Sequence, residues 1–345
     1  MPHLIPPLYP EVSYGLAPKL PDNTLFFGSG RQALKFLTLR LLERQESLLF
    51  VLPAYTCETV VQAISEAGGE VTFVDVGDDL DLDLDDVRRV VQAHPLRRLV
   101  LLPTSLFGAP LRNHKALFPD AWVIEDRCQA IADPASQADY QILSFGKGKL
   151  VSGMGGGALV GQVSAFSAAH AALPSLAGTV SSVVGSVVME QLVLRRGWRW
   201  LHTWLDKSAG PLPDELSAEP IDIHALSAQR ARWIAHSMQR ADLASRVRLA
   251  DQFANGIPET LRFNIPKGLP YLRYPVKGDW KLPGASSGRM YALTWRMAER
   301  QRGVPMPGAA RLVGCSMLPT HALVTPRHVR HYGDVLSNAM AAGQA

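Results

Sequence analysis

Residues 121–161 read AWVIEDRCQAIADPASQADYQILSFGKGKLVSGMGGGALVG. Three short apolar runs divide this stretch, at 122–124, 140–143 and 158–160, and each has the length of a buried strand. Asp126 closely follows the first run, Ser144 follows the second, and Lys149 lies in the loop after it. Neighbouring strands would hold this carboxylate, hydroxyl and amine close together, so we expect the functional site here.

The composition is that of an ordinary globular protein: 345 residues, 47% apolar and 19% charged. This length allows two domains. The net charge of +4 slightly favours small anionic ligands, and no basic run resembles a nucleic-acid module, so we expect no nucleic-acid partner. Cys57, Cys128 and Cys315 are scattered, which argues against a disulfide framework or metal site and predicts a reducing, cytoplasmic location.

Three segments bear on membrane contact. Residues 150–189 carry no charge, but Gly, Ser, His and Pro interrupt them, and their apolar runs are too short for a span. The N-terminus lacks the pattern of a signal peptide, so we expect a soluble protein. Residues 195–204, RRGWRWLHTW, place Trp200 and Trp204 on one helix face. Such a helix could contact an anionic membrane surface or a diphosphate substrate, but we favour a packing or dimer helix.

The periodicity predicts an α/β chain in two domains. Residues 1–225 are expected to form a large domain with a mostly parallel, helix-flanked sheet, and residues 226–345 a smaller α+β domain. Expected strands are 48–52, 70–74, 98–102 and 271–276. One helix is expected to begin just after Gly30. Further helices are expected at 58–66, 84–93, 289–300 and 325–340, with a longer helical region at 225–253.

Three glycine- or acid-rich segments require interpretation. GSGRQA at 28–33 opens a helix, where free N–H groups and the helix dipole favour phosphate. It also matches a dinucleotide fingerprint, but the next strand ends without the acid that such a site needs, and a simple helix cap stays possible. GMGGG at 153–157 precedes a strand, which favours a tight turn. DLDLDLDD at 79–86 lacks the glycine and glutamate of a calcium loop, so we expect a solvated loop.

The residues of the opening stretch fit pyridoxal phosphate (PLP). Asp126 would pair with the protonated pyridine nitrogen, and Gln129 could reach the 3-oxygen of the ring. A lysine in this loop, Lys149 or its competitor Lys147, would form the Schiff base. Ser144 could donate to the phosphate. Taken one at a time, a capping acid and a solvated lysine pair remain alternatives.

Together these motifs resemble the DegT/DnrJ/StrS family of PLP-dependent sugar aminotransferases, which have the type I, aspartate-aminotransferase-like fold. The matching segments are SGRQAL at 29–34, LPAYT at 52–56, the strand from Gly68 to Asp75, EDRCQA at 125–130, SFGKGK at 144–149 and LPTH at 318–321. Their order and spacing carry the resemblance. It implies Lys149 as the Schiff-base lysine and Asp126 as the pyridinium partner.

The resemblance also implies a homodimer that transfers an amino group from glutamate or glutamine to a nucleotide-linked keto-sugar. Such reactions serve polysaccharide, lipopolysaccharide or secondary-metabolite sugar biosynthesis. By the same resemblance, Gly30, Arg31, Gln32 and Ser144 would anchor the cofactor phosphate.

Two departures leave alternatives. The family's ring-stacking aromatic would fall at Cys57, so Tyr55 or Phe107 is expected to stack on the ring instead. An Asn-x-Arg segment that usually reaches the partner's site is missing near 223–225. The alternatives are another PLP reaction, by an amino-acid transaminase or a dehydratase, and a non-catalytic protein that binds a sugar nucleotide or has a regulatory role. Lysine at the Schiff-base position disfavours the dehydratase branch that has histidine there.

Overall fold

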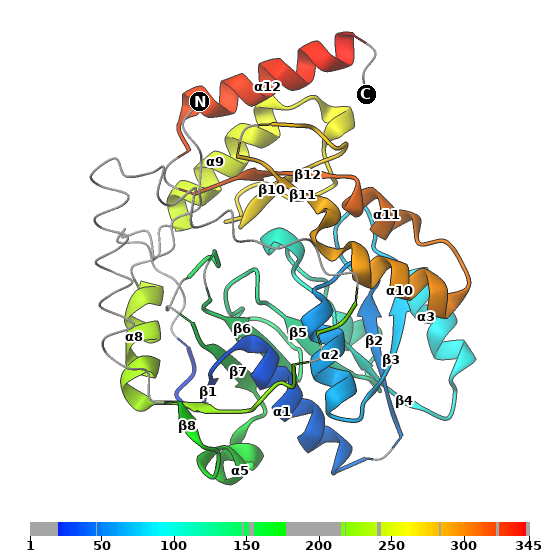
Figure 1. Cartoon of the computed structure of the whole chain (residues 1–345), viewed down its shortest axis with the longest axis vertical. Helices are drawn as coiled ribbons and strands as arrows, with labels where there is room; N and C mark the ends of the chain where they lie inside the picture. The colour runs from blue at the N-terminus through cyan, green and yellow to red at the C-terminus, as the bar shows by residue number, and fades with distance from the viewer. Residues whose placement is uncertain are drawn as a thin grey trace.

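Two β-sheets organise the chain (Figure 1). The computed structural model describes residues 20–45, 47–146, 148–151, 155–176, 215–217, 219–239, 243–282, 284–321 and 324–342. In the view of Figure 1 a small sheet with two helices lies above a large sheet flanked by helices. Residues 195–204, whose packing we predicted, fall outside the described residues.

The large sheet has nine strands in the order β3-β2-β4-β5-β6-β7-β1-β9-β8. Their bounds are β1 Leu25–Phe27, β2 Leu48–Pro53, β3 Glu70–Val74, β4 Arg98–Leu101, β5 Trp122–Asp126, β6 Tyr140–Ser144, β7 Gly157–Gly161, β8 Ser175–Leu176 and β9 Ala225–Leu226. The pairs from β3 to β6 are parallel, whereas β7 is antiparallel to both β6 and β1. Parallel strands point their carboxyl ends toward one edge, which is where ligands bind in such sheets.

Helices cover both faces of the parallel part. They are α1 Gly30–Leu42, α2 Glu58–Glu66, α3 Leu84–Ala93, α4 His114–Leu117, α5 Ser167–Ala171 and α8 Ala228–Gln239. Every residue of β2 is buried: Phe50 and Leu52 pack in the core that holds α1 and α2, while Leu49 and Val51 pack against α3. This two-sided burial explains why the strand reads as a continuous apolar run.

The smaller sheet has the order β10-β12-β11, with both pairs antiparallel. Its elements are β10 Arg273–Val276, β11 Ser286–Ser287 and β12 Ser316–Pro319, with helices α9 Leu243–Gly256, α10 Ala292–Arg302, α11 Pro307–Val313 and α12 Pro326–Ala341. Short 3-10 turns complete the chain: η1 Leu106–Gly108, η2 Ser164–Phe166, η3 Glu259–Leu261 and η4 Gly288–Tyr291. Phe253 of α9 contacts Tyr332 of α12 with ring centroids 6.0 Å apart, so these two helices pack together above the sheet.

Most predicted elements are confirmed, and three expected ranges differ from the structure. Residues 225–253 are not one helical region, because Ala225–Leu226 forms β9, which pairs with β1 of the large sheet. The helix expected at 289–300 begins only at Ala292, since residues 288–291 form the 3-10 turn η4. The strand expected at 271–276 begins at Arg273.

The division into domains at 225/226 stays a prediction. That boundary falls inside β9, and Ile234 and Met238 of α8 pack with Leu143 and Phe145 of the large sheet and the loop after it. This packing favours a boundary after α8, between it and α9.

The acid-rich segment 79–86 is not a solvated loop as expected. Asp81 and Asp86 are only 2% and 3% exposed. Both carboxylate oxygens of Asp81 lie 2.9 Å from His114 Nε2, and Asp81 also accepts from the Arg112 N–H at 2.8 Å. Among the described residues no group of His, Cys, Asp and Glu has the arrangement of a metal site. The buried carboxylates therefore tie loops together.

Asp81 should make the stability of the fold depend on acid pH. Burial by itself raises the pKa of Asp81, but the hydrogen bonds and charges of His114 and Arg112 outweigh it and hold that pKa below its ordinary value. A lowered folded-state pKa stabilises the fold above the ordinary value of about 4, and this contribution is lost as pH falls through the folded-state pKa. We expect the urea midpoint to fall below about pH 4.

Asp81→Asn removes this titration, so the urea midpoint of the variant should depend less on pH in that range. At neutral pH the variant's free energy of unfolding should be lower than that of the parent protein by about 1–3 kcal/mol. The control is Asp85→Asn, because the Asp85 side chain is 79% exposed. If the urea midpoint of Asp81→Asn fell as steeply at acid pH as that of the parent protein, Asp81 would not be the source of the pH dependence.

Candidate active site

A cavity of about 220 Å³ lies at the carboxyl ends of the parallel strands. Its walls come from the beginnings of α1 and α2, the ends of β5 and β6, the loop after β6 and the turn η4. The residues that line it are Ser29, Gly30, Arg31, Leu34, Thr56, Cys57, Thr59, Val60, Leu102, Thr104, Asp126, Cys128, Gln129, Ile142, Ser144, Lys149 and Tyr291. The stretch that opened the sequence analysis thus meets segments far away in the chain.

One end of the cavity suits a phosphate. Ser29 caps α1 by accepting a hydrogen bond from the Gln32 N–H at 3.3 Å. Within the described part of the chain the N–H group of Arg31 has no hydrogen-bond acceptor, nor has the Ser144 hydroxyl a partner, whereas the Gly30 N–H faces Gly156 in the bridge between Ser29 and Gly156. Free amides at a helix N-terminus together with a hydroxyl form a site for an anion.

The glycine run brings β7 against the start of α1. Gly155 and Gly156 have φ of +106° and +104°, values that favour glycine, and Gly156 forms a bridge with Ser29. A Cβ at Gly157 would lie 2.3 Å from the Gly30 nitrogen. The predicted close backbone approach is therefore present at 155–157, whereas residues 153 and 154 lie outside the described ranges.

Gly157→Ala should disturb this contact. The added methyl must push the start of α1 away from β7, which typically costs about 1–3 kcal/mol and displaces the amides that face the cavity. We expect a lower melting temperature and faster loss of bound cofactor on dialysis. Gly256→Ala is the matched control, because a Cβ there meets nothing within 4 Å. Equal cofactor retention by both variants would contradict the expectation.

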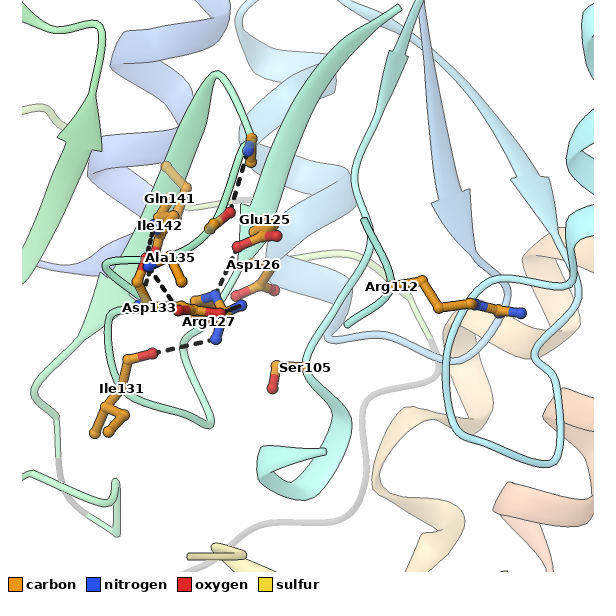
Figure 2. Close-up of polar contacts among 12 residues, drawn as sticks. Ser105, Arg112, Glu125, Asp126, Arg127, Ile131, Asp133, Ala135, Gln141 and Ile142 are labelled. Atoms are coloured by element: carbon orange, nitrogen blue, oxygen red, sulfur yellow. Dashed lines mark hydrogen bonds and ion pairs between the residues drawn. The ribbon is translucent and has the colours of Figure 1, made fainter. Parts of the chain in front are cut away.

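Asp126 is the carboxylate of the cavity, and Glu125 is not. Figure 2 shows Arg127 between Glu125 and Asp133. Arg127 Nε donates to Glu125 at 2.6 Å, and its Nη2 donates to Asp133 at 3.1 Å. Asp126, 6% exposed, accepts from the Cys128 N–H at 2.9 Å through Oδ1, and its carboxylate lines the cavity. The carboxylate can therefore accept a hydrogen bond from a ligand there.

Lys149 faces the same cavity. No hydrogen bond or ion pair joins its amine to another described side chain. Burial raises the pKa of the Cys128 thiol well above its ordinary value, the Asp126 carboxylate adds to this, and the nearby Lys149 opposes it. The competing Lys147 is outside the described residues.

Gln129 and Tyr291 join the two parts of the protein at the cavity wall. Gln129 Oε1 accepts from the Phe107 N–H at 3.0 Å, and its Nε2 donates to the Tyr291 hydroxyl at 3.2 Å. Burial raises the pKa of Tyr291 well above its ordinary value, so the phenol stays protonated at neutral pH. Tyr291 was not predicted, because it lies 162 residues from Gln129 and belongs to no motif of the sequence.

Two predicted ligands of the cofactor do not reach the cavity with their side chains. Tyr55 is fully buried and donates to the Gly288 carbonyl at 2.8 Å. The amide oxygen of Gln32 accepts from Gly28 and His224 and holds β1 and β9 together. Phe107, the other stacking candidate, is also buried outside the lining, whereas Cys57 lines the cavity. Tyr291 is the aromatic side chain that the structure places in the wall.

Residues 22–179 match the model of the DegT/DnrJ/EryC1/StrS aminotransferase family. The match spans less than half of the chain, and it confirms within these residues the resemblance that the motifs indicated. Members of the family are PLP-dependent aminotransferases, and the chain is an enzyme of this class with PLP as its cofactor. A comparison with curated proteins found no match in sequence.

Solved structures share the fold over nearly the whole chain. The PseC aminotransferase of Helicobacter pylori, involved in the biosynthesis of pseudoaminic acid, has a TM-score of 0.65 and 14% identity, covering 92% of this chain and 87% of its own. DesI, solved with its TDP-sugar product, has a TM-score of 0.64 and 17% identity, and the match covers 93% of this chain and 81% of DesI. A DegT/DnrJ/EryC1/StrS aminotransferase from Brucella abortus has a TM-score of 0.63 and 15% identity, and the match covers 91% of this chain and 85% of that protein. The predicted fold class is confirmed.

The side chains of the cavity fit PLP. Asp126 offers a carboxylate oxygen for the pyridine nitrogen, and Lys149 offers an amine for the aldehyde. The Arg31 amide and the Ser144 hydroxyl suit the phosphate, beside Gly30 at the start of α1. No helix in the described part of the chain is long and apolar enough to cross a membrane.

Proposed function

We propose that this enzyme transfers an amino group from glutamate or glutamine to a nucleotide-linked keto-sugar. The observation that carries the proposal is the convergence of Asp126, Lys149 and the start of α1 on one cavity, in a chain of this family. DesI is a structural neighbour that was solved with a TDP-sugar product, which supports a sugar nucleotide as substrate. A homodimer, a cytoplasmic location and a role in polysaccharide or secondary-metabolite sugar biosynthesis remain part of the proposal.

Each residue of the cavity has a separate role in the proposed reaction. When bound, PLP supplies an aldehyde for amines and a ring that withdraws electrons from the substrate carbon. Asp126 would keep a proton on the ring nitrogen, and the Arg31 amide and the Ser144 hydroxyl would hold the phosphate. Lys149 Nζ accepts the proton that leaves the α-carbon of the amino donor and delivers one to the carbon that is aminated.

Gln129 and Tyr291 hold the wall of this site. The hydrogen bond between them fixes the Gln129 amide from both sides, because its oxygen is held by the Phe107 N–H. We assign to the Gln129 amide a contact with the 3-oxygen of the ring, and to Tyr291 the aromatic contact that Tyr55 does not provide.

The test is spectroscopic. Purified protein should be yellow, and L-glutamate or L-glutamine should remove the visible band while the matching 2-oxo acid forms. A keto-sugar nucleotide should then restore the band, and screening such compounds identifies the substrate. A yellow protein that no amino donor bleaches would refute amino transfer and favour a sugar-nucleotide-binding protein. Bleaching that only 2-oxo acids reverse would favour an amino-acid transaminase.

A further inference from the structure

A second, smaller hollow adjoins the cofactor cavity and shares Lys149 with it. Its volume is about 30 Å³, and its described lining contains three cationic residues and no Asp or Glu. The lining residues are Gly148, Lys149, Arg246, Leu272, Arg273, Gly284, Ser286, Met317, Pro319 and His321. Four of them, Arg273, Ser286, Met317 and Pro319, belong to strands of the small sheet, so the hollow lies between that sheet and the Lys149 loop.

Arg273 is the cation that this hollow leaves without a counter-charge. It begins β10 and is partly buried, yet no described residue forms a hydrogen bond or ion pair with its guanidinium. Burial lowers the pKa of Arg273, an effect that the phenols of Tyr291 and Tyr55 oppose. A desolvated guanidinium without an anion is costly to the fold, which is typical of a side chain that binds an anionic ligand.

Arg246 is held rigidly on the other side. It is 6% exposed, and its Nη1 donates to Thr320 Oγ1 at 3.1 Å and to the Leu272 carbonyl at 3.4 Å. Thr320 in turn donates to the Tyr271 carbonyl at 2.6 Å. Arg246 is therefore anchored to the ends of the small sheet, and its positive charge is fixed beside the hollow.

The size of the hollow selects among anions. One water needs about 10–15 Å³ of cavity of this kind, so about 30 Å³ accepts a group of two or three heavy atoms. A carboxylate has that size, whereas a diphosphate does not. The planar fork of arginine also matches a carboxylate in two-point contact.

We propose that Arg273, with Arg246 behind it, binds a carboxylate of the amino donor and thereby holds the donor's amine beside Lys149. This inference rests on the proposed amino transfer. It makes Arg273 the residue that selects an amino acid as donor, and it leaves the sugar nucleotide to the larger cavity.

The test measures binding to the holoenzyme by calorimetry with glutarate, a dicarboxylate that has no amine to transfer. Arg273→Gln should weaken glutarate binding about 10- to 100-fold, the effect of losing a charge-assisted contact. It should raise the KM for L-glutamate and leave UDP binding unchanged. Arg273→Lys keeps the charge but not the planar guanidinium, so its affinity for glutarate should lie between those of the parent protein and Arg273→Gln. Arg289→Gln is the control, because the Arg289 side chain is 64% exposed and pairs with Asp279.

The other outcomes distinguish failure of this inference from failure of the proposed amino transfer. Loss of UDP binding in Arg273→Gln with unchanged glutarate binding would identify a diphosphate site and overturn it. Unchanged binding of both, or a wild-type holoenzyme that does not bind glutarate, would overturn it too. Arg273-dependent glutarate binding in a protein that glutamate cannot bleach would support the carboxylate site and refute amino transfer. Bleaching by glutamate that is unaffected by Arg273→Gln would refute this inference alone.

Discussion

Lys149→Ala is expected to yield a protein without the visible absorption band of bound PLP. The variant lacks the amine that binds the aldehyde, and it also lacks the group that moves the proton at the substrate carbon. Loss of a positioned acid–base group alone costs about 10²- to 10⁴-fold in rate. Absorption spectra after dialysis and single-turnover bleaching with L-glutamate measure the two effects separately.

Lys147→Ala is the control, because it removes a lysine from the same loop while Lys149 remains. It should keep both the band and the bleaching. A normal band in Lys149→Ala, with loss of the band in Lys147→Ala, would move the Schiff-base role to Lys147. A normal band in both variants would overturn the assignment to this loop.

Asp126→Asn is expected to keep the cofactor and lose most of the rate. Its Oδ1 would still accept from the Cys128 N–H, so the end of β5 should stay folded. The neutral amide cannot hold a proton on the ring nitrogen. Removing one partner of a buried charge pair costs about 3–5 kcal/mol, which corresponds to about 10²- to 10³-fold in rate. Stopped-flow bleaching by L-glutamate measures the loss.

Asp120→Asn makes the same chemical change just before the other end of β5, where the side chain is exposed. It should bleach at the parental rate. If Asp126→Asn bleached as fast as this control, Asp126 would be a structural residue at the strand end, which was the alternative that the sequence left open.

The cofactor end of the site was predictable from local sequence. Asp126, Ser144 and Lys149 each follow a short apolar run, and the carboxyl ends of adjacent parallel strands meet at one edge. The helix start at Gly30 was predictable for a similar reason, because a glycine turn before an amphipathic run opens a helix with free amides. These features need only a few residues of context.

Tyr55 and Gln32 do not line the cavity, and the reason is the same for both. Both lie in motifs, but the fates of their side chains depend on partners 233 and 192 residues away, the Gly288 carbonyl and the His224 N–H. The acid-rich segment was misjudged in the same way, since Asp81 is buried by Arg112 and His114. A sequence pattern reports which side chains are polar, whereas burial is decided by what packs over them.

The sequence by itself determined the α/β class, the parallel strands and the cofactor-binding loop, because strand period, helix start and glycine turns act over a few residues. Only the tertiary structure decided that Tyr291 completes the cavity wall and that Arg273 and Arg246 stand beside Lys149. Tertiary packing brings these residues near the Lys149 loop more than 90 positions earlier in the chain, and no local pattern encodes such a contact. The group that we propose to select the amino donor therefore depends on tertiary packing, whereas the group that we propose to bind the cofactor could be predicted from local sequence.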